Sequence, residues 1–424
     1  MKNSRLKIAV IGLGYVGLPL AIEFAKKRQV IGFDVNSKRI NDLKLGLDKT
    51  KEIAKKKLIN VKKLFLTNLK KYLELANCYI VTVPTPISKS RKPDLIPLLD
   101  ASKMIGKMLK KNDVVIYEST VYPGCTEEKC IPILEKYSKL KFNIDFYCGY
   151  SPERINPGDK KNKITKIKKV TSGSNKKTAL FVDNLYNEII TAGTFKASSI
   201  KVAEASKVIE NAQRDLNIAY MNELSIIFNK LDINFNDVIE AAKTKWNFLS
   251  FHPGLVGGHC IGVDPYYLIH KSKVAGYVPE VISSARYLND KMGNFVASRF
   301  IKKMKSKLIP IKKSKILIMG LTFKENCSDL RNSGISSVIK NLIKNKCVLD
   351  YFDPLTTQAD IKKIYGKKSI IKLIDKKYDG IIIAVAHEYF KKMGINKIIK
   401  LGKKKHVIFD LKPIFYKDYS DLTL

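Results

Sequence analysis

A glycine-rich turn near the start of the chain constrains the fold more than any other feature. Glycines stand at positions 12, 14 and 17, between a β-branched run at 6–11 and an apolar segment at 18–26 that predicts a helix. In a Gly-x-Gly-x-x-Gly turn between strand and helix, the first two glycines let the backbone approach a pyrophosphate. The third lets helix and strand lie close together, and the helix N-terminus offers N–H groups to an anion. The turn therefore predicts a dinucleotide-binding α/β domain.

The second predicted strand helps to identify the dinucleotide. Residues 30–33 end at Asp34, which lies 22 residues after Gly12. A carboxylate at this place accepts hydrogen bonds from a ribose 2′-OH and repels a 2′-phosphate, so NAD is favoured over NADP. Lys38 and Arg39 weaken this preference, because nearby cations accommodate a 2′-phosphate. The predicted cofactor contacts in this region are Gly12, Gly14, Tyr15, Val16, Gly17, Asp34 and Arg39.

Polar residues follow three further apolar runs. The run at 79–83 leads into Thr85, and the run at 114–117 leads into Thr120. Open α/β sheets bind ligands at the carboxyl ends of their strands, so both threonines are candidate cofactor contacts. The run at 146–150 leads into Glu153 and Arg154. These two residues are either an ordinary loop ion pair or, at the same sheet edge, a base and an anion contact.

The middle of the chain predicts long helices. Residues 199–230 carry apolar residues at a helical period, with Lys207, Asn211 and Arg214 at spacings that share one face. That face is either the solvated side of the helix or the lining of a cleft, and the sequence favours neither. A second helix is predicted at 279–304, before a lysine-rich linker at 305–315.

The α/β rhythm resumes after the linker. Apolar runs at 316–320, 348–354, 380–385 and 407–410 predict a second nucleotide-binding-like sheet. The expected fold class is therefore α/β, with two Rossmann-like doubly wound domains joined by a central helical domain with a long helix. The expected domain boundaries are 1–195, 196–305 and 306–424. His387 has no partner visible in the sequence and is interpreted as structural.

A cysteine lies on a second glycine-rich loop, in Gly257-Gly258-His259-Cys260, with Asp264 four residues later. A thiol on such a loop, near a carboxylate, suits covalent catalysis on a carbonyl. The alternative is a buried structural cysteine beside a tight turn, because free cysteine behaves as a small hydrophobic residue.

Composition limits the possible partners. The net charge of +39 comes from lysines spread along all 424 residues, without an arginine cluster or a basic block interleaved with aromatics. This argues against specific nucleic-acid binding, although a positive field attracts anionic ligands. Seven cysteines without a paired framework fit a reducing cytoplasm, and no metal-ligand set accompanies Cys125 and Cys130. Lys7 and Glu23 interrupt the apolar N-terminal run, so no membrane insertion is expected.

Together these motifs resemble the UDP-glucose/GDP-mannose dehydrogenase family. GLGYVGLP, VPTP, ESTVYPG, SPERINPG, AExxKxxxN, GGHCIGVDP and FKEN-x-x-D-x-R occur in the family's order. The forms of SPERINPG and GGHCIGVDPYY are similar to the branch acting on UDP-N-acetylglucosamine or its galacto epimer in Vi-type capsule or O-antigen synthesis. The resemblance implies a homodimeric enzyme that oxidises C6 to the uronic acid with two NAD. UDP-N-acetylmannosamine and UDP-glucose remain alternative substrates, and a two-electron hydroxy-acid dehydrogenase remains an alternative activity.

The resemblance also implies residue roles. Cys260 would be the nucleophile that carries the substrate as a thiohemiacetal and then a thioester. Lys207 would transfer protons and stabilise the oxyanion, Asp264 would hold a water with Thr120, and Glu153 would be the base for hydrolysis. Asn211 would belong both to the catalytic set and to the substrate contacts. The other implied substrate contacts are Arg154, Ile155, Lys207, Arg214, Gly257, Phe323, Lys324 and Lys412, and Arg331 would contact NAD. One departure is His252, where many relatives have arginine.

Overall fold

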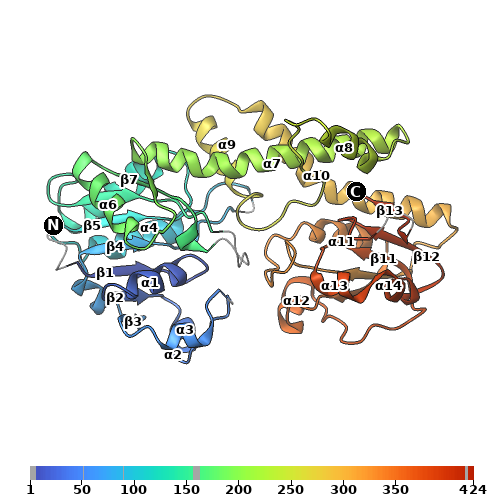
Figure 1. Cartoon of the computed structure of the whole chain (residues 1–424), viewed down its shortest axis with the longest axis horizontal. Helices are drawn as coiled ribbons and strands as arrows, with labels where there is room; N and C mark the ends of the chain where they lie inside the picture. Colours follow the sequence, from blue (N-terminus) through green and yellow to red (C-terminus); the bar gives the residue numbers. More distant parts are fainter. Residues whose placement is uncertain (1–5, 51, 89, 156–162, 416–418) are drawn as a thin grey trace. The chain divides into compact units, whose positions relative to one another are not determined.

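The computed structural model describes residues 6–50, 52–88, 90–155, 163–415 and 419–424. The end of the SPERINPG motif, at 156–158, lies outside the described residues. The chain divides into two compact units (Figure 1). Unit 1 comprises Met1–Glu210 and Tyr266–Tyr277, and unit 2 comprises Asn211–Pro265 and Val278–Leu424. The domain boundaries expected near 195 and 305 remain a prediction.

A sheet that counts eight strands among the described residues forms the centre of unit 1, in the order β3-β2-β1-β4-β5-β6-β7-β8. Neighbouring strands are parallel except β6 and β7. The order reverses between β1 and β4, where doubly wound sheets bind their ligand. The strands are β1 (Ile8–Ile11), β2 (Val30–Phe33), β3 (Leu64–Thr67), β4 (Cys78–Val81), β5 (Val114–Tyr117), β6 (Tyr147–Tyr150), β7 (Lys169–Gly173) and β8 (Thr194–Lys196).

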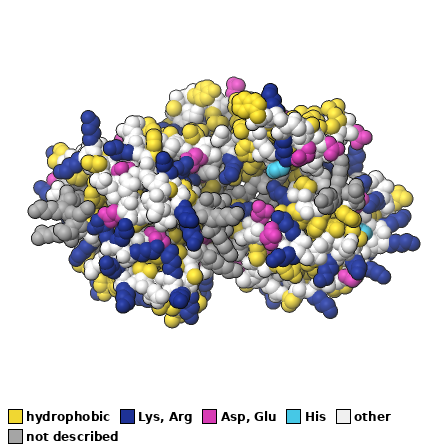
Figure 2. Space-filling model, viewed as in Figure 1, with side chains coloured by type: hydrophobic (Ala, Val, Ile, Leu, Met, Phe, Trp, Pro, Cys, Tyr) yellow, Lys and Arg dark blue, Asp and Glu magenta, His cyan; other side chains and the backbone are white. Residues whose placement is uncertain are grey.

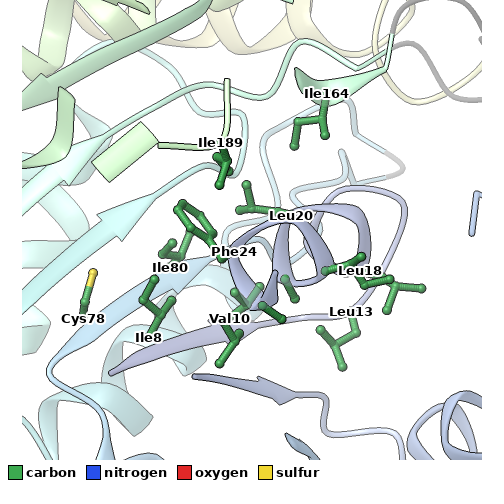
Figure 3. Close-up of a cluster of buried hydrophobic side chains, with 14 of the residues drawn as sticks. Ile8, Val10, Leu13, Leu18, Leu20, Phe24, Cys78, Ile80, Ile164 and Ile189 are labelled. Atoms are coloured by element: carbon green, nitrogen blue, oxygen red, sulfur yellow. The ribbon is translucent and has the colours of Figure 1, made fainter. Parts of the chain in front are cut away.

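Helices surround this sheet (Figure 1). They are α1 (Gly17–Ala25), α2 (Ser37–Lys44), α3 (Lys55–Ile59), α4 (Ile96–Gly106), α5 (Ile131–Ser138) and α6 (Lys176–Asn187), with the short 3₁₀ helices η2 (Lys70–Leu75) and η4 (Ile164–Lys166) and the short π-helix η3 (Thr126–Cys130). Every residue of α1 is buried. Figure 3 shows Leu20 and Phe24 of α1 beside Ile8 and Ile80 of the sheet, in one apolar cluster. The apolar run after the glycine turn is therefore a core helix.

The sheet of unit 2 has the order β10-β9-β11-β12-β13, five strands within the described ranges. Its neighbouring strands are all parallel, and the order reverses between β9 and β11. The strands are β9 (Lys315–Met319), β10 (Val348–Phe352), β11 (Tyr378–Ile383), β12 (Gly402–Asp410) and β13 (Leu422–Thr423). The helices are α8 (Phe235–Lys243), α10 (Glu280–Ser306), α11 (Ile335–Lys344), α12 (Gln358–Tyr365), α13 (Glu388–Met393) and α14 (Ile395–Leu401). Phe300 of α10 packs in the core with Ile318 and Val338.

Two helices continue from one unit into the other along the sequence, α7 (Ile200–Lys230) and α9 (Asp264–Val274). With α8 and α10 they make up the helical stretch that separates the two sheets in the chain. The predicted fold class is thus confirmed. Within the described residues, no helix is long and apolar enough to cross a membrane. Figure 2 shows Lys and Arg side chains scattered over the visible face among acidic and hydrophobic ones, as the sequence predicts.

The two sheets share one local design. The strand that begins each unit's sheet in the chain, β1 or β9, is followed directly by a glycine with positive φ, Gly12 at +94° and Gly320 at +88°. The next backbone N–H donates to the aspartate that follows the second strand, Asp34 at 2.9 Å in unit 1 and Asp353 at 2.7 Å in unit 2. Each unit therefore has a tight turn at the carboxyl edge, beside the point where the strand order reverses.

Candidate active site

The glycine turn of unit 1 has the shape that a dinucleotide needs. A Cβ on Gly14 would meet nothing within 4 Å, so the space beside this backbone is open. A Cβ on Gly17 would lie 1.9 Å from the Gly12 oxygen and 2.3 Å from Thr82 Oγ1, so only glycine fits there. No side chain caps the N-terminus of α1 at Val16. The turn thus leaves both room and helix-end N–H groups for a pyrophosphate.

Asp34 and Arg39 flank this turn in different ways. Asp34 accepts the Leu13 N–H through Oδ2, as described above, and the Asn36 N–H through Oδ1 at 2.9 Å. Arg39 donates from Nε to the Leu13 carbonyl at 2.9 Å and pairs with Asp48 at 2.8 Å. Arg39 therefore braces the backbone of the turn, and its direct contact with the cofactor remains a prediction.

The loops after β4 and β5 are tied together at the carboxyl edge. Thr85 Oγ1 donates to the Thr120 carbonyl at 2.7 Å. The hydroxyl of Tyr267 donates to the Thr85 carbonyl at 2.8 Å. The structure therefore brings the two threonines together at this edge, and their contact with the cofactor remains a prediction.

Glu153 is held by the backbone on one side only. Its Oε1 accepts the N–H of Arg154 at 2.6 Å and also the N–H of Ile155. Its Oε2 is buried without a hydrogen-bond partner in the described structure, 3.8 Å from Lys169 Nζ. The Arg154 guanidinium pairs with Glu210 at 2.8 Å, so Glu153 and Arg154 do not form the simple side-chain ion pair.

A buried ion pair that the sequence does not predict lies beside Glu153. Lys169 Nζ lies 2.6 Å from Glu118 Oε2 and donates to the Pro152 carbonyl at 3.0 Å. The Tyr186 hydroxyl donates to the other oxygen of Glu118. Burial raises the pKa of Glu118, and the nearby Lys169 opposes that rise. Glu118 lies within a recognised motif, but Lys169 lies 51 residues away in β7 with no local signal, so only the fold reveals the pair.

The double glycine of unit 2 is required by a close approach of two loops. A Cβ on Gly257 would lie 2.7 Å from the Asn332 carbonyl oxygen. Gly258 has a φ of +83°, and a Cβ there would lie 2.7 Å from the Phe323 ring. The N–H of Gly258 donates to Asn332 O at 3.2 Å, and Asn332 Nδ2 donates back to Gly258 O at 3.2 Å. These bonds fix the loop that carries Cys260.

Cys260 differs from the other cysteines in exposure. All seven cysteines lie in described residues, and six are buried, whereas Cys260 is half-buried. Its Sγ lies 3.5 Å from His259 Nδ1, and His259 Nε2 lies 3.3 Å from Asp329 Oδ2. Neither His259 nor Asp329 has a role predicted from the sequence. Cys260 is thus the least buried of the seven cysteines, and its sulfur lies beside a titratable ring.

Asp264 begins α9 and is buried, at 2% exposure. Its N–H donates to the Cys260 carbonyl at 2.8 Å, and its Oδ2 accepts Asn211 Nδ2 at 2.5 Å. The structure therefore joins three of the predicted catalytic residues of unit 2. Lys207 is buried in α7 of unit 1. Its role, like the sharing of a water by Asp264 and Thr120, remains a prediction.

A cavity of about 630 Å³ lies in unit 2 at the carboxyl ends of β9 and β11, a volume typical of small-molecule sites. Phe323, Lys324 and Lys412 line it, together with His252. Burial lowers the pKa of Lys412, and it also lowers the pKa of His252, with Lys243 and Lys412 adding to the effect. Several cationic side chains around one cavity suit an anionic ligand such as a diphosphate.

His387 supports the loop beside this cavity. It is fully buried, and its Nδ1 accepts the Asn326 N–H at 3.0 Å. Its Nε2 lies 3.2 Å from Thr322 Oγ1 and 3.4 Å from Asp353 Oδ2. These contacts support its interpretation as a structural residue.

Two predicted arginines lie at exposed positions in unit 2. Arg214 is exposed on α7. Arg331 is about half exposed and pairs with Asp329 at 2.6 Å. Their contacts with substrate and NAD remain predictions. Within the described ranges, no three His, Cys, Asp or Glu side chains are grouped to hold a metal ion.

Most of the chain matches domain models of one protein family. Models of the UDP-glucose/GDP-mannose dehydrogenase family match at 6–190 (NAD binding domain), 201–291 (central domain) and 317–417 (UDP binding domain). UDP-N-acetyl-D-glucosamine 6-dehydrogenases from Pseudomonas aeruginosa and Salmonella typhi are 57% and 55% identical, each over 99% of both chains. A UDP-D-ManNAc dehydrogenase structure from Pyrococcus horikoshii superposes with a TM-score of 0.88 at 30% identity, over 97% of this chain and 96% of that one.

Proposed function

Because the chain belongs to the UDP-glucose/GDP-mannose dehydrogenase family and is an NAD-dependent oxidoreductase, we propose that it oxidises C6 of a UDP-N-acetylhexosamine to the uronic acid. The substrate is UDP-N-acetylglucosamine or its galacto epimer, and the product supplies surface polysaccharide synthesis. One observation carries this choice: two relatives with more than half of their residues identical, along nearly the whole chain, are named as UDP-N-acetyl-D-glucosamine 6-dehydrogenases.

The cofactor accepts a hydride in each of two oxidation steps. The first step turns the C6 alcohol into an aldehyde, and the Cys260 sulfur then adds to the aldehyde carbon as a thiohemiacetal. Loss of the second hydride gives a thioester, which water hydrolyses to the carboxylate and the free thiol. Two NAD and one water are consumed, and two NADH and three protons are released. The partial exposure of Cys260, in contrast to the six buried cysteines, supports this route.

The surrounding residues supply proton transfer and charge stabilisation. Lys207 moves the proton of the alcohol and stabilises the oxyanion. Glu153 acts as the base for thioester hydrolysis. Its buried Oε2 supports this role, because that oxygen accepts no hydrogen bond in the described structure and can therefore accept a proton. Asp264 holds the water with Thr120, and Asn211 fixes the Asp264 carboxylate at 2.5 Å.

The nucleotide of the substrate occupies the cavity of unit 2. Lys324 and Lys412 contact the diphosphate, Phe323 lines the cavity wall, and His252 takes the place of the arginine of many relatives. The remaining substrate contacts are Arg154, Ile155, Arg214 and Gly257, and Arg331 contacts NAD.

The enzyme acts as a cytoplasmic homodimer. Seven free cysteines support a reducing compartment. Exposed apolar side chains on the unit 2 part of α7, including Tyr220 and Ile227, support an interface with a second copy. Sedimentation equilibrium at micromolar concentration tests this state, and a monomer at all concentrations would contradict it.

The function is tested by following NADH with UDP-N-acetylglucosamine, UDP-N-acetylgalactosamine, UDP-N-acetylmannosamine and UDP-glucose side by side. We expect two NADH per sugar with one of the first two substrates and a uronic acid product by mass spectrometry. One NADH per molecule, on a hydroxy acid, would support the two-electron alternative. Preference for UDP-N-acetylmannosamine or UDP-glucose would keep the mechanism and change the substrate.

A further inference from the structure

The His259 ring lies between a nucleophile and a carboxylate. Its Nδ1 is 3.5 Å from Cys260 Sγ, and its Nε2 is 3.3 Å from Asp329 Oδ2. The side chain of His259 is 27% exposed and that of Asp329 only 4%. Thiol, imidazole and carboxylate in this order have the arrangement that activates nucleophiles in acyl-transfer enzymes.

Hydrogen bonds from Arg331 hold the Asp329 carboxylate in place on the side of the His259 ring away from Cys260. Asp329 Oδ1 accepts the backbone N–H of Arg331 at 2.9 Å, and Oδ2 accepts its Nη2 at 2.6 Å. The Asp329 carbonyl in turn accepts the Phe323 N–H at 3.1 Å, and the Phe323 ring lies 5.9 Å from the His259 ring, centroid to centroid. The imidazole is therefore held from both loops, with one nitrogen directed at the sulfur.

The charges around the ring favour its protonated form. Burial by itself lowers the pKa of His259, but the bonds to Asp329 and Cys260 outweigh burial and the repulsion of Arg331, and the pKa rises to about 9. Burial would raise the pKa of Asp329, but its bonds to His259 and Arg331 outweigh burial and hold that pKa well below its usual range. The charged groups facing the ring are thus Asp329 and Arg331, and the Cys260 sulfur lies on its other side.

We propose that His259 is the base that takes the proton of the Cys260 thiol, with Asp329 as its positioning residue. The S–H bond breaks, and the proton moves to Nδ1 while Nε2–H stays at ion-pair distance from Asp329. The thiolate electron pair then forms the C–S bond to the aldehyde carbon. The carbonyl π pair moves to oxygen, which takes a proton from Lys207. This step rests on the covalent role of Cys260 in the proposed function.

The test follows alkylation of the protein without substrate or cofactor. Iodoacetamide is added between pH 5.5 and 9, and modification of Cys260 is measured by peptide mass spectrometry, with the six buried cysteines as internal references. We expect a nearly pH-independent rate for wild type from pH 6.5 to 8.5. His259→Gln should give a rate that rises with pH as for an ordinary thiol. At pH 6.5 its rate should fall by up to about 100-fold, because a thiol with a pKa near 8.5 is roughly 1% ionised there.

Two further variants separate proton transfer from a purely structural role. Asp329→Asn keeps the ring but removes its charge partner, so its rate at pH 6.5 should lie between wild type and His259→Gln. His406→Gln changes an unrelated histidine on β12 and should match wild type. If the wild-type rate itself rises roughly 50-fold between pH 6.5 and 8.5, as for an ordinary thiol with a pKa near 8.5, the proposal is overturned even where the variants do not fold.

Turnover distinguishes this proposal from the proposed function. In His259→Gln we expect the first NADH to form at the wild-type rate and the second to slow at least about tenfold, since thiol addition lies between them. Absence of NADH from wild type on every UDP-sugar would refute the function and leave the alkylation result standing. Normal formation of both NADH by His259→Gln would refute the role of His259 alone.

Discussion

Asn211 donates from Nδ2 to Oδ2 of Asp264 across 2.5 Å. Asp264 also donates its N–H to the Cys260 carbonyl, so the amide of Asn211 fixes the residue that closes the cysteine turn. This bond gives the Asn211 amide a structural task within α7. It also shows that a residue implied to contact substrate has a second task in positioning a carboxylate.

Replacing this amide by an acid should make stability depend on pH. In Asn211→Asp, two carboxylates at hydrogen-bond distance share a proton, which raises the pKa of one of them above its unfolded value. The stability from the shared proton is present below the unfolded pKa and is lost as pH rises through the raised pKa. A rise of about two pKa units corresponds to roughly 2.7 kcal/mol. Thermal unfolding between pH 4 and 8 measures this loss.

The matched control for that variant is Gln213→Glu, an exposed amide-to-acid change in the same helix. It should alter the pH dependence of the unfolding free energy by less than about 0.5 kcal/mol. Equal pH dependence in the two variants would mean that the Asn211–Asp264 contact does not persist in solution.

Two glycines of the first turn should respond differently to alanine. Gly14→Ala should fold normally, since its Cβ meets nothing within 4 Å, but should bind NAD at least about tenfold more weakly, or 1.4 kcal/mol, by filling the pyrophosphate site. Gly17→Ala should lose about 1–3 kcal/mol of stability, because its Cβ would lie 1.9 Å from the Gly12 oxygen. Fluorescence titration with NADH and thermal unfolding separate the effects. Wild-type NAD affinity in Gly14→Ala would place the pyrophosphate elsewhere.

The buried pair of Glu118 and Lys169 should act as one unit. Glu118→Gln or Lys169→Met alone should cost about 3–5 kcal/mol in urea unfolding, because each leaves a buried charge without its partner. The double variant should cost less than the sum of the two. Burial raises the pKa of Glu118, so stability is lost as pH rises through that pKa, and Glu118→Gln should flatten this dependence.

An exposed ion pair provides the control for the Glu118 and Lys169 variants. Glu127 lies 4.0 Å from Lys201 with both side chains exposed, and Glu127→Gln should cost less than about 1 kcal/mol. Additive costs for Glu118→Gln and Lys169→Met would show that the two side chains do not interact in solution.

His387 should influence nucleotide binding without touching the nucleotide. His387→Ala leaves the Asn326 N–H without its acceptor, which should cost roughly 1–3 kcal/mol of stability and loosen the loop that carries Lys324. UDP affinity, measured by titration calorimetry, should fall about tenfold, or 1.4 kcal/mol, while NAD affinity stays as in wild type. Unchanged UDP affinity would show that the loop holds its shape without the histidine.

The sequence by itself determines the local elements of this protein. The glycines at 12, 14 and 17 indicate a tight turn, and a Cβ at position 17 would have no room there. The six residues 12–17 are enough to predict this turn. Strands β1, β2, β4 and β5, and the helix at 200–230, follow from apolar runs and helical periodicity, which depend on neighbours a few residues away. The motif order was enough to identify the family.

Strands with weak local signals were not predicted. β3 is only partly buried, β7 carries a single large apolar residue in the sequence KVTSG, and β8 is mostly exposed, so no long apolar run marks any of them. They become strands because an edge of the existing sheet offers unpaired backbone groups.

Only the tertiary structure decides which distant side chains meet. Lys169 reaches Glu118 because β7 lies in the same sheet as β5, and sequence cannot give that strand order. His259 reaches Asp329 because two loops of unit 2 approach within backbone hydrogen-bond distance, which the double glycine permits but does not direct. Local steric preference acts over a few residues, whereas the burial and pairing of charges depend on the path of the whole chain.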